Sequence, residues 1–87
     1  MSASAPGGGV RAVVEVLAKA LTDRPDDVRV VESQHRQVTL VELFVSPQDI
    51  AKVIGRQGRT AAALRTLAST AGEKEGKTVT LEIREGR

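Results

Sequence analysis

Two glycines three residues apart, Gly55 and Gly58, lie in the run VIGRQGR and form the most informative motif of the chain. Glycines at this spacing allow a tight turn whose bare N–H groups can approach an anion. Arg56 and Gln57 between them, and Arg59 after them, add side-chain donors. The motif therefore predicts a phosphate-binding turn, and single-stranded nucleic acid is the partner it implies. With 8 glycines in 87 residues, this spacing arises by chance about 0.7 times, so the surrounding residues must support the prediction.

The positive charge of the chain is concentrated around this turn. The net charge is only +2. Residues 46–71 carry four basic side chains and one acidic side chain, whereas residues 1–45 carry five and six, and residues 72–87 carry four of each. A local basic patch is the electrostatic footprint expected of a phosphate-binding surface. Four cations spread over two helices are also common on an ordinary solvated surface, so charge alone leaves both interpretations open.

No other cluster of residues predicts catalysis or metal binding. The chain has no cysteine, and His35 is its only histidine, so it offers neither a thiolate site nor a histidine pair. Ser46 is better explained as a helix cap than as a nucleophile, and Asp26 and Asp27 are better explained as turn residues. We expect no enzymatic activity, no metal site and no cofactor.

Aromatic residues are almost absent, and this narrows the kinds of RNA-binding surface that the chain can form. Phe44 is the only one. RNA-recognition motifs and cold-shock domains stack bases on several aromatic side chains. The composition therefore excludes both, and favours a site that grips phosphates and places bases against aliphatic side chains.

Apolar spacing predicts the first elements of the fold. Residues 10–21 follow the i, i+3, i+4 pattern of an amphipathic helix, which Pro25 prevents from continuing. Residues 28–32 and 38–45 are β-branched, apolar runs that predict two strands, and a polar hairpin loop over residues 33–37 joins them. The second strand is apolar on both faces, which favours a central position in a sheet.

A short helix is predicted directly before the glycine turn. Ser46 can cap it, Pro47 fits its first position, and Asp49 completes a pattern like a capping box. The helix must end at Gly55, because glycine there begins the turn.

A longer helix and a third strand follow the turn. Residues 59–71 predict an amphipathic helix with Leu64 and Leu67 on its apolar face and Gly72 as its C-terminal stop. Residues 78–84 then alternate between apolar and polar side chains, as in a half-buried strand.

The order of these elements predicts an α+β fold with a three-stranded mixed sheet and three helices on one face. The hairpin makes the first two strands antiparallel, and the helical crossover makes the second and third parallel. We expect one domain over residues 10–87, preceded by a flexible tail over residues 1–9. The chain shows neither a signal sequence nor an apolar run long enough for a membrane span, so we expect a cytoplasmic protein.

These residues resemble a known family. The strand-helix-G-x-x-G-helix-strand core with VIGRQGR across its turn is similar to a KH domain, and the helix and strand before the core resemble the type II arrangement. More narrowly, the segment LFVSPQDIAKVIGRQGRTAAALRT resembles the KhpA family of small bacterial single-domain KH proteins. The resemblance covers about residues 10–84 and includes alanine at position 61, where many KH domains carry a bulkier aliphatic residue.

The resemblance implies that the G-x-x-G loop clamps the sugar-phosphate backbone of about four nucleotides while bases lie in an apolar groove. The residues that it assigns to RNA binding are Ile50, Lys52, Ile54, Gly55, Arg56, Gln57, Gly58 and Arg59. Leu40, Val53 and Ala61 are further candidates for the groove wall. Core packing is the preferred interpretation for Val53 and Leu64.

The resemblance also implies partners and a cellular role. Single-stranded RNA is the expected ligand, and the expected protein partners are a second copy in a homodimer and the larger KH-containing protein KhpB in a heterodimer. The implied role is that of a non-catalytic post-transcriptional regulator or RNA chaperone linked to cell elongation and division. The alternative is a protein-interaction adaptor that uses the KH fold mainly for dimerisation.

Overall fold

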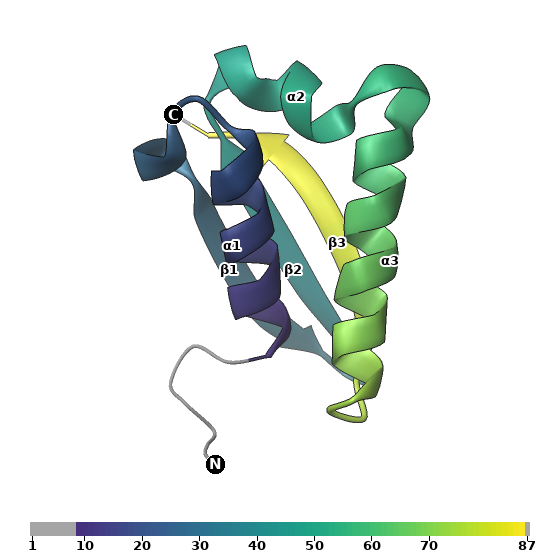
Figure 1. Ribbon diagram of the computed structural model, residues 1–87. Helices are drawn as coiled ribbons and strands as arrows, with labels where there is room; N and C mark the ends of the chain where they lie inside the picture. Colours follow the sequence, from purple (N-terminus) through teal and green to yellow (C-terminus); the bar gives the residue numbers. More distant parts are fainter. Residues whose placement is uncertain (1–8, 87) are drawn as a thin grey trace.

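The elements of the fold follow one another in the predicted order. The computed structural model describes residues 9–86. Along them run α1 (Val10–Leu21), β1 (Arg29–His35), β2 (Val38–Val45), α2 (Ile50–Ile54), α3 (Arg59–Glu73) and β3 (Thr78–Glu85) (Figure 1). The same residues contain the short 3-10 turns η1 (Pro25–Asp27), η2 (Pro47–Asp49) and η3 (Arg56–Gly58). The tail predicted over residues 1–9 lies, apart from Gly9, outside the described residues.

The strands form one mixed sheet in which β2 lies between β1 and β3, as predicted. β1 runs antiparallel to β2, with Val30 opposite Leu43. β3 runs parallel to β2, with Leu81 beside Val41. The parallel pairing follows from the two helices between β2 and β3, because a crossover returns the chain to the end of the sheet where β2 began.

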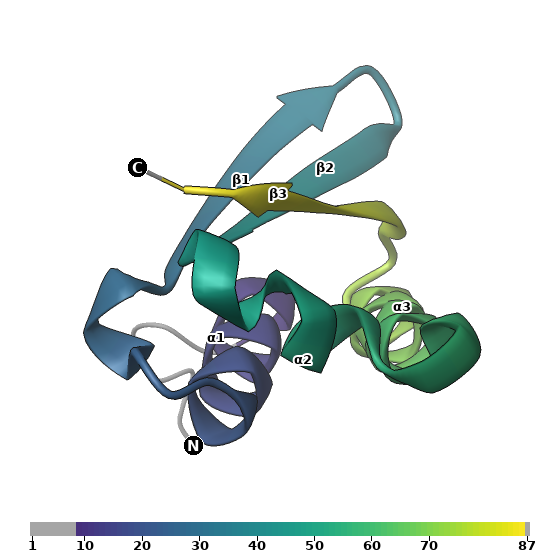
Figure 2. The same cartoon turned by 90° about the horizontal axis from the view of Figure 1, so that it is seen from above.

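All three helices cover the same face of the sheet, and the core lies between the two layers (Figure 2). On β2 the alternate residues Thr39, Val41, Leu43 and Val45 are fully buried, as period-two alternation requires. The helices complete the core with apolar residues spaced three or four apart. These are Val10, Val14, Ala18, Val53, Leu64 and Ala68.

The connection between β1 and β2 differs from the prediction. The predicted polar loop over residues 33–37 is wrong, because β1 continues to His35 and only Arg36 and Gln37 make the turn. Arg36 takes a positive φ of 58° there, a conformation for which glycine or asparagine is the usual signal. His35 therefore ends a strand, where its Nε2 lies 2.9 Å from Oγ of Ser33.

The end of α3 also differs from the prediction. Gly72 does not stop the helix but lies buried within it. A Cβ on Gly72 would overlap the Cγ2 methyl of Val79 and lie 3.3 Å from the carbonyl oxygen of Lys77. Glycine is required here because α3 approaches β3 closely, and the positive φ that follows the helix belongs to Gly76, at 69°.

Within residues 9–86 no helix is both long enough and apolar enough to cross a membrane.

Candidate nucleic-acid interface

The helix that leads into the glycine turn is held by contacts that its sequence did not predict. Pro47 begins η2 as expected, but the side chain of Ser46 makes no capping hydrogen bond, so that prediction is wrong. The backbone N–H of Asp49 donates to the carbonyl oxygen of Ser46 at 2.8 Å, which closes the turn through the main chain. The Asp49 side chain does not cap α2 either. Its carboxylate accepts hydrogen bonds from the backbone N–H groups of Asp23 and Arg24, at 3.2 and 3.0 Å.

The backbone between α2 and α3 has the tight conformation that the glycine spacing predicted. Gly55 ends α2 with φ 78° and ψ 173°. Gln57 and Gly58 both adopt the left-handed conformation, with φ values of 56° and 74°. Left-handed geometry at a glutamine costs about 1 kcal/mol, and backbone strain of this kind clusters at functional sites. The turn closes with a hydrogen bond of 3.1 Å from the N–H of Gly58 to the carbonyl oxygen of Gly55.

The two glycines are required for different reasons. A Cβ on Gly55 would lie 2.6 Å from Cβ of Thr60 and 2.9 Å from its backbone nitrogen, and would overlap its hydroxyl oxygen. A Cβ on Gly58 would meet nothing within 4 Å. Gly55 therefore serves the packing of the turn, whereas Gly58 leaves open space on its surface that a ligand backbone can approach.

The turn opens directly into the amino end of α3. The first N–H groups of an α-helix have no partner within the helix, and the helix dipole makes this end positive. α3 is 15 residues long and carries no acidic residue in its first turn. Such an end attracts phosphate groups.

The side chains of the turn are exposed, but they are not equally free. Nη2 of Arg59 donates to Oε1 of Gln57 at 2.9 Å, which links the two side chains across the turn. Lys52 is engaged elsewhere, because its Nζ lies 3.2 Å from Oδ2 of Asp23 and 3.8 Å from Oδ1 of Asp49. A phosphate would have to compete with these two carboxylates for Lys52.

The aliphatic residues near the turn divide between the core and the surface. Val53 and Leu64 belong to the core, which confirms the preferred interpretation. Ala61 is only 3% exposed and is buried with them. Ile50 and Ile54 are half-buried, and Ile50 packs against the core from the first position of α2. Leu40 is separated from them, because it points to the outer face of the sheet, away from the helices.

That separation follows from the alternation along β2. The neighbours of Leu40, Thr39 and Val41, are both fully buried against the helix layer. A residue between two inward-facing neighbours must face outward. Leu40 therefore does not share a groove wall with the α2 residues.

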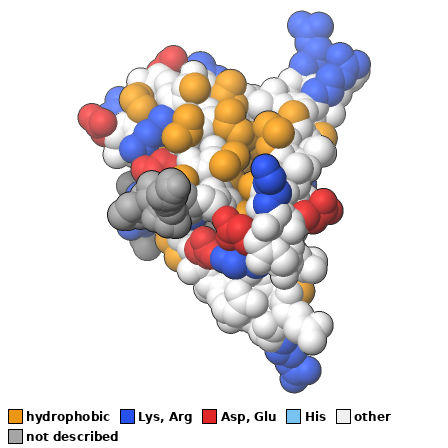
Figure 3. Space-filling view, turned by 60° about the horizontal axis from the view of Figure 1, so that its bottom comes forward, with side chains coloured by type: hydrophobic (Ala, Val, Ile, Leu, Met, Phe, Trp, Pro, Cys, Tyr) orange, Lys and Arg blue, Asp and Glu red, His pale blue; other side chains and the backbone are white. Residues whose placement is uncertain are grey.

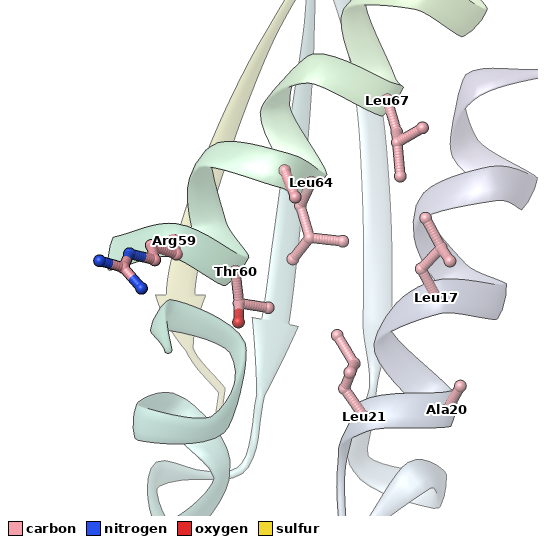
Figure 4. A pocket seen from close by; sticks show the side chains of 8 residues that line it. Leu17, Ala20, Leu21, Arg59, Thr60, Leu64 and Leu67 are labelled. Carbon is pink, nitrogen blue, oxygen red and sulfur yellow. The ribbon is translucent and has the colours of Figure 1, made fainter. Parts of the chain in front are cut away.

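A groove between α1 and α3 was not predicted. Leu17 and Leu21 of α1 point toward Leu64 and Leu67 of α3 across it, and Thr60 lies at its end nearest the glycine turn (Figure 4). Leu67 is 47% exposed, so the apolar face predicted for residues 59–71 is only partly buried. The sequence of α1 does contain a signal for this groove. Its apolar residues cover more of the helix than the single stripe that packing against the core requires.

The groove continues into a wider apolar area, here called the apolar helix surface. It consists of Ala12, Val13, Val16, Leu17, Ala20 and Leu21 of α1 with Ala63 and Leu67 of α3. Val16 is 66% exposed, the highest value among the exposed large hydrophobic residues. A space-filling view of the molecule shows hydrophobic side chains gathered over the helices (Figure 3). Exposed apolar patches of this kind mark interaction sites.

No group of three or more acidic or histidine side chains within residues 9–86 is arranged to hold a metal ion.

Comparison with known sequences gives a consistent result. The sequence model of the family described as "KhpA/KhpB, KH domain" matches residues 11–83. The chain is 47% identical over 74 residues to the RNA-binding protein KhpA of Clostridium perfringens, covering 85% of this chain and 99% of that protein. It is 49% identical over 73 residues to the protein of the same name from Aquifex aeolicus, covering 84% and 92% of the two chains.

Comparison with solved structures supports the fold. Aquifex aeolicus Era Y63A bound to GDP.AlF4- aligns with 88% of this chain at a TM-score of 0.66 and 19% identity. Era in complex with MgGDPNP and nucleotides 1506–1542 of 16S ribosomal RNA aligns with 87% at a TM-score of 0.61. This chain spans only 30% and 29% of those two chains. At this level of identity the likeness concerns the fold alone.

Proposed function

This chain belongs to the KhpA/KhpB KH-domain family, and we propose that it is a non-catalytic protein that binds single-stranded RNA by gripping the sugar-phosphate backbone at Gly55–Gly58. The observation that carries the proposal is the left-handed pair Gln57 and Gly58 at the amino end of α3. The relatives named above are RNA-binding proteins.

The geometry of the turn supports contact with phosphate. The backbone at Gly58 has open space for a closely approaching chain, and the positive end of α3 follows directly. Arg56 precedes and Arg59 follows the pair Gln57 and Gly58, both arginines are exposed, and a guanidinium is well suited to pairing with phosphate oxygens. We propose that the exposed parts of the half-buried residues Ile50 and Ile54 contact bases, and that Lys52 contributes only when phosphate displaces it from Asp23.

The experiment that tests this function is a titration with short single-stranded RNA of randomised sequence, monitored at individual backbone amides by nuclear magnetic resonance. We expect the amide signals of Arg56, Gln57, Gly58 and Thr60 to shift most, and to follow one saturating curve. The amide signal of Arg11, an exposed cation in the first turn of α1, serves as the control and should stay in place. Shifts concentrated on the outer face of the sheet would contradict the proposal.

The cellular role is proposed from membership of the family. We propose that the protein acts in the cytoplasm as a post-transcriptional regulator or RNA chaperone, linked to cell elongation and division. One turn that grips few nucleotides binds weakly and with strong salt dependence, so the regulated RNAs are best identified by crosslinking in the native cell. Recovery of no RNA above an uncrosslinked control would argue against this role.

A second candidate function is that of an adaptor that dimerises, and the apolar helix surface favours it. We propose a second copy of this chain as the occupant. The surface adjoins the groove that Leu17, Leu64 and Leu67 line, and the side chain of Val16, which is 66% exposed, protrudes from it. Because ridge and groove lie on the same face, two copies related by a twofold axis can fill each other's grooves. A dimer would also present two glycine turns to one RNA, which raises avidity.

Val16→Glu combined with Leu67→Glu is expected to convert a dimer of twice the 9.2 kDa chain mass into a monomer. Both side chains are exposed, so the fold should survive while the buried charges prevent association. Light scattering after size-exclusion chromatography measures the change. Val31→Glu, at an apolar residue that is 43% exposed on β1, is the matched control and should remain a dimer. A wild-type monomer would exclude homodimerisation, and association only with KhpB would assign the surface to the heterodimer.

A further inference from the structure

The buried carboxylate of Asp49 links the start of α2 to the segment that follows α1. Asp49 is fully buried. Its Oδ1 accepts the N–H of Asp23 at 3.2 Å, and its Oδ2 accepts the N–H of Arg24 at 3.0 Å. These partners lie 26 and 25 residues away along the chain. Both oxygens are thus committed to main-chain donors of another element, and we call this arrangement the Asp49 clasp.

The clasp matters because α2 cannot hold its own position. α2 is five residues long, and a helix of that length is unstable without tertiary contacts. Inside α2 the fully buried contact is Val53. The clasp at one end, Val53 near the other and Ile50, which packs against the core between them, fix α2, and Gly55 follows directly. Without the clasp, the side-chain anchors that remain, Ile50 and Val53, are apolar and non-directional, so α2 can tilt and carry the glycine turn with it.

We infer that Asp49 is a positioning residue for RNA binding: its clasp on the Asp23 and Arg24 amides fixes the direction in which α2 presents the turn Gly55–Gly58. The inference rests on the proposed function and deepens it. Asp49 itself is buried and does not touch RNA. The cation that faces its carboxylate is Nζ of Lys52, 3.8 Å from Oδ1, and Arg24 directs its guanidinium to Asp27 instead.

Charge and positioning predict opposite effects for Asp49→Asn. Removing a negative charge near a phosphate site should by itself strengthen RNA binding. Asparagine keeps one acceptor oxygen but turns an amide NH2 group toward the second N–H donor, so half of the clasp is lost. If positioning dominates, the affinity for short single-stranded RNA falls about tenfold, a typical size for such coupling.

Asp23→Asn is the matched control. It removes the same charge from the same neighbourhood, since the Asp23 carboxylate also pairs with Lys52, but it leaves the clasp intact because the clasp uses the backbone N–H of Asp23. Fluorescence anisotropy with labelled RNA of randomised sequence measures both variants, after circular dichroism has shown that they are folded. We expect unchanged or tighter binding for Asp23→Asn and weaker binding for Asp49→Asn.

Equal or tighter binding by folded Asp49→Asn would overturn the inference while leaving the proposed function standing, whereas failure of the wild-type protein to bind RNA would overturn the proposed function.

If Asp49→Asn does not fold, hydrogen exchange in the wild-type protein supplies the test. If the clasp strengthens RNA binding, bound RNA must stabilise the clasp by the same factor, because coupling between two sites is reciprocal. Bound RNA should therefore slow hydrogen exchange at the Asp23 and Arg24 amides about tenfold. Unchanged exchange at both amides in saturating RNA would also overturn the inference.

Discussion

Replacing Arg56 and Gln57 together by aspartate is expected to weaken binding to short single-stranded RNA by at least about 100-fold. The change exchanges one positive charge for two negative charges at the point where phosphates are proposed to sit. Both side chains are exposed, so the loss should not come from unfolding. Fluorescence anisotropy at low salt, where surface charge is least screened, gives the affinity.

The stability of this variant provides a check that separates charge from folding. Aspartate tolerates the left-handed conformation of position 57 better than glutamine does, and a carboxylate at the amino end of α3 is favoured by the helix dipole. Urea unfolding should therefore show stability equal to or above that of the wild type. Arg56→Lys with Gln57→Asn, which preserves the charge but not the forked geometry of the guanidinium, should weaken binding far less than the two aspartates do. Unchanged affinity in the aspartate variant would count against the RNA-binding function.

Gly55→Ala should destabilise the fold by about 3 kcal/mol, far more than Gly58→Ala, which should cost about 1 kcal/mol. At Gly55 the backbone, with φ 78° and ψ 173°, lies in a region that essentially only glycine occupies. A methyl group there would also press into Thr60, with its Cβ only 2.6 Å from Cβ of that residue. At Gly58 the backbone is left-handed, but the space for a methyl group is empty. The midpoints of urea unfolding measure the difference.

The RNA affinities of the two glycine variants should not follow their stabilities. We expect Gly58→Ala to remain folded but to place a methyl group on the surface that the RNA backbone is proposed to approach. Because the methyl group keeps the RNA backbone from its proposed position, the affinity for RNA should fall at least about fivefold. Equal stability losses at the two positions would refute the different roles assigned to them. Unimpaired RNA binding by Gly58→Ala would remove the argument that the open space belongs to the site.

Strong periodic patterns predicted most of the fold. The bounds of α1 agree with those predicted from apolar residues three or four apart, and the bounds of β2 agree with those predicted from its apolar run. Each element buries one continuous face, which is why the pattern was clear. The antiparallel and parallel pairings follow from a short hairpin and a helical crossover, and both are present. The central position of β2 follows from apolar residues on both of its faces, one buried against the helices and the other partly exposed.

The features that sequence did not predict depend on contacts between distant residues. Gly72 looks like a helix stop until β3 is seen to lie against it, with Val79 in the space of a side chain. Asp49 has the spacing of a capping residue, but its partners are amides near the end of α1. The turn at Arg36 lacks the glycine or asparagine that usually marks it. None of these three can be inferred from local spacing.

The candidate site was only partly predictable for the same reason. The glycine spacing indicated the tight turn, but not that Gln57 takes a left-handed conformation or that its side chain accepts from Arg59. The place of Lys52 in the sequence, three residues before Gly55, suggests a phosphate ligand. In the structure its ammonium group pairs with the carboxylate of Asp23, which follows α1. Leu40 is apolar, as a residue of the groove wall should be, but it lies on the face of the sheet that the helices do not cover.

The turn Gly55–Gly58 is proposed to grip RNA through its backbone and its charge. The amide-resolved titration, performed in parallel on the wild-type protein and on the variant with aspartate at positions 56 and 57, tests this proposal. In the wild type, it predicts saturable shifts at Gln57, Gly58 and Thr60. In the variant, it predicts a folded spectrum without those shifts. The same saturable shifts in both proteins, or shifts confined to other parts of the molecule, would contradict it.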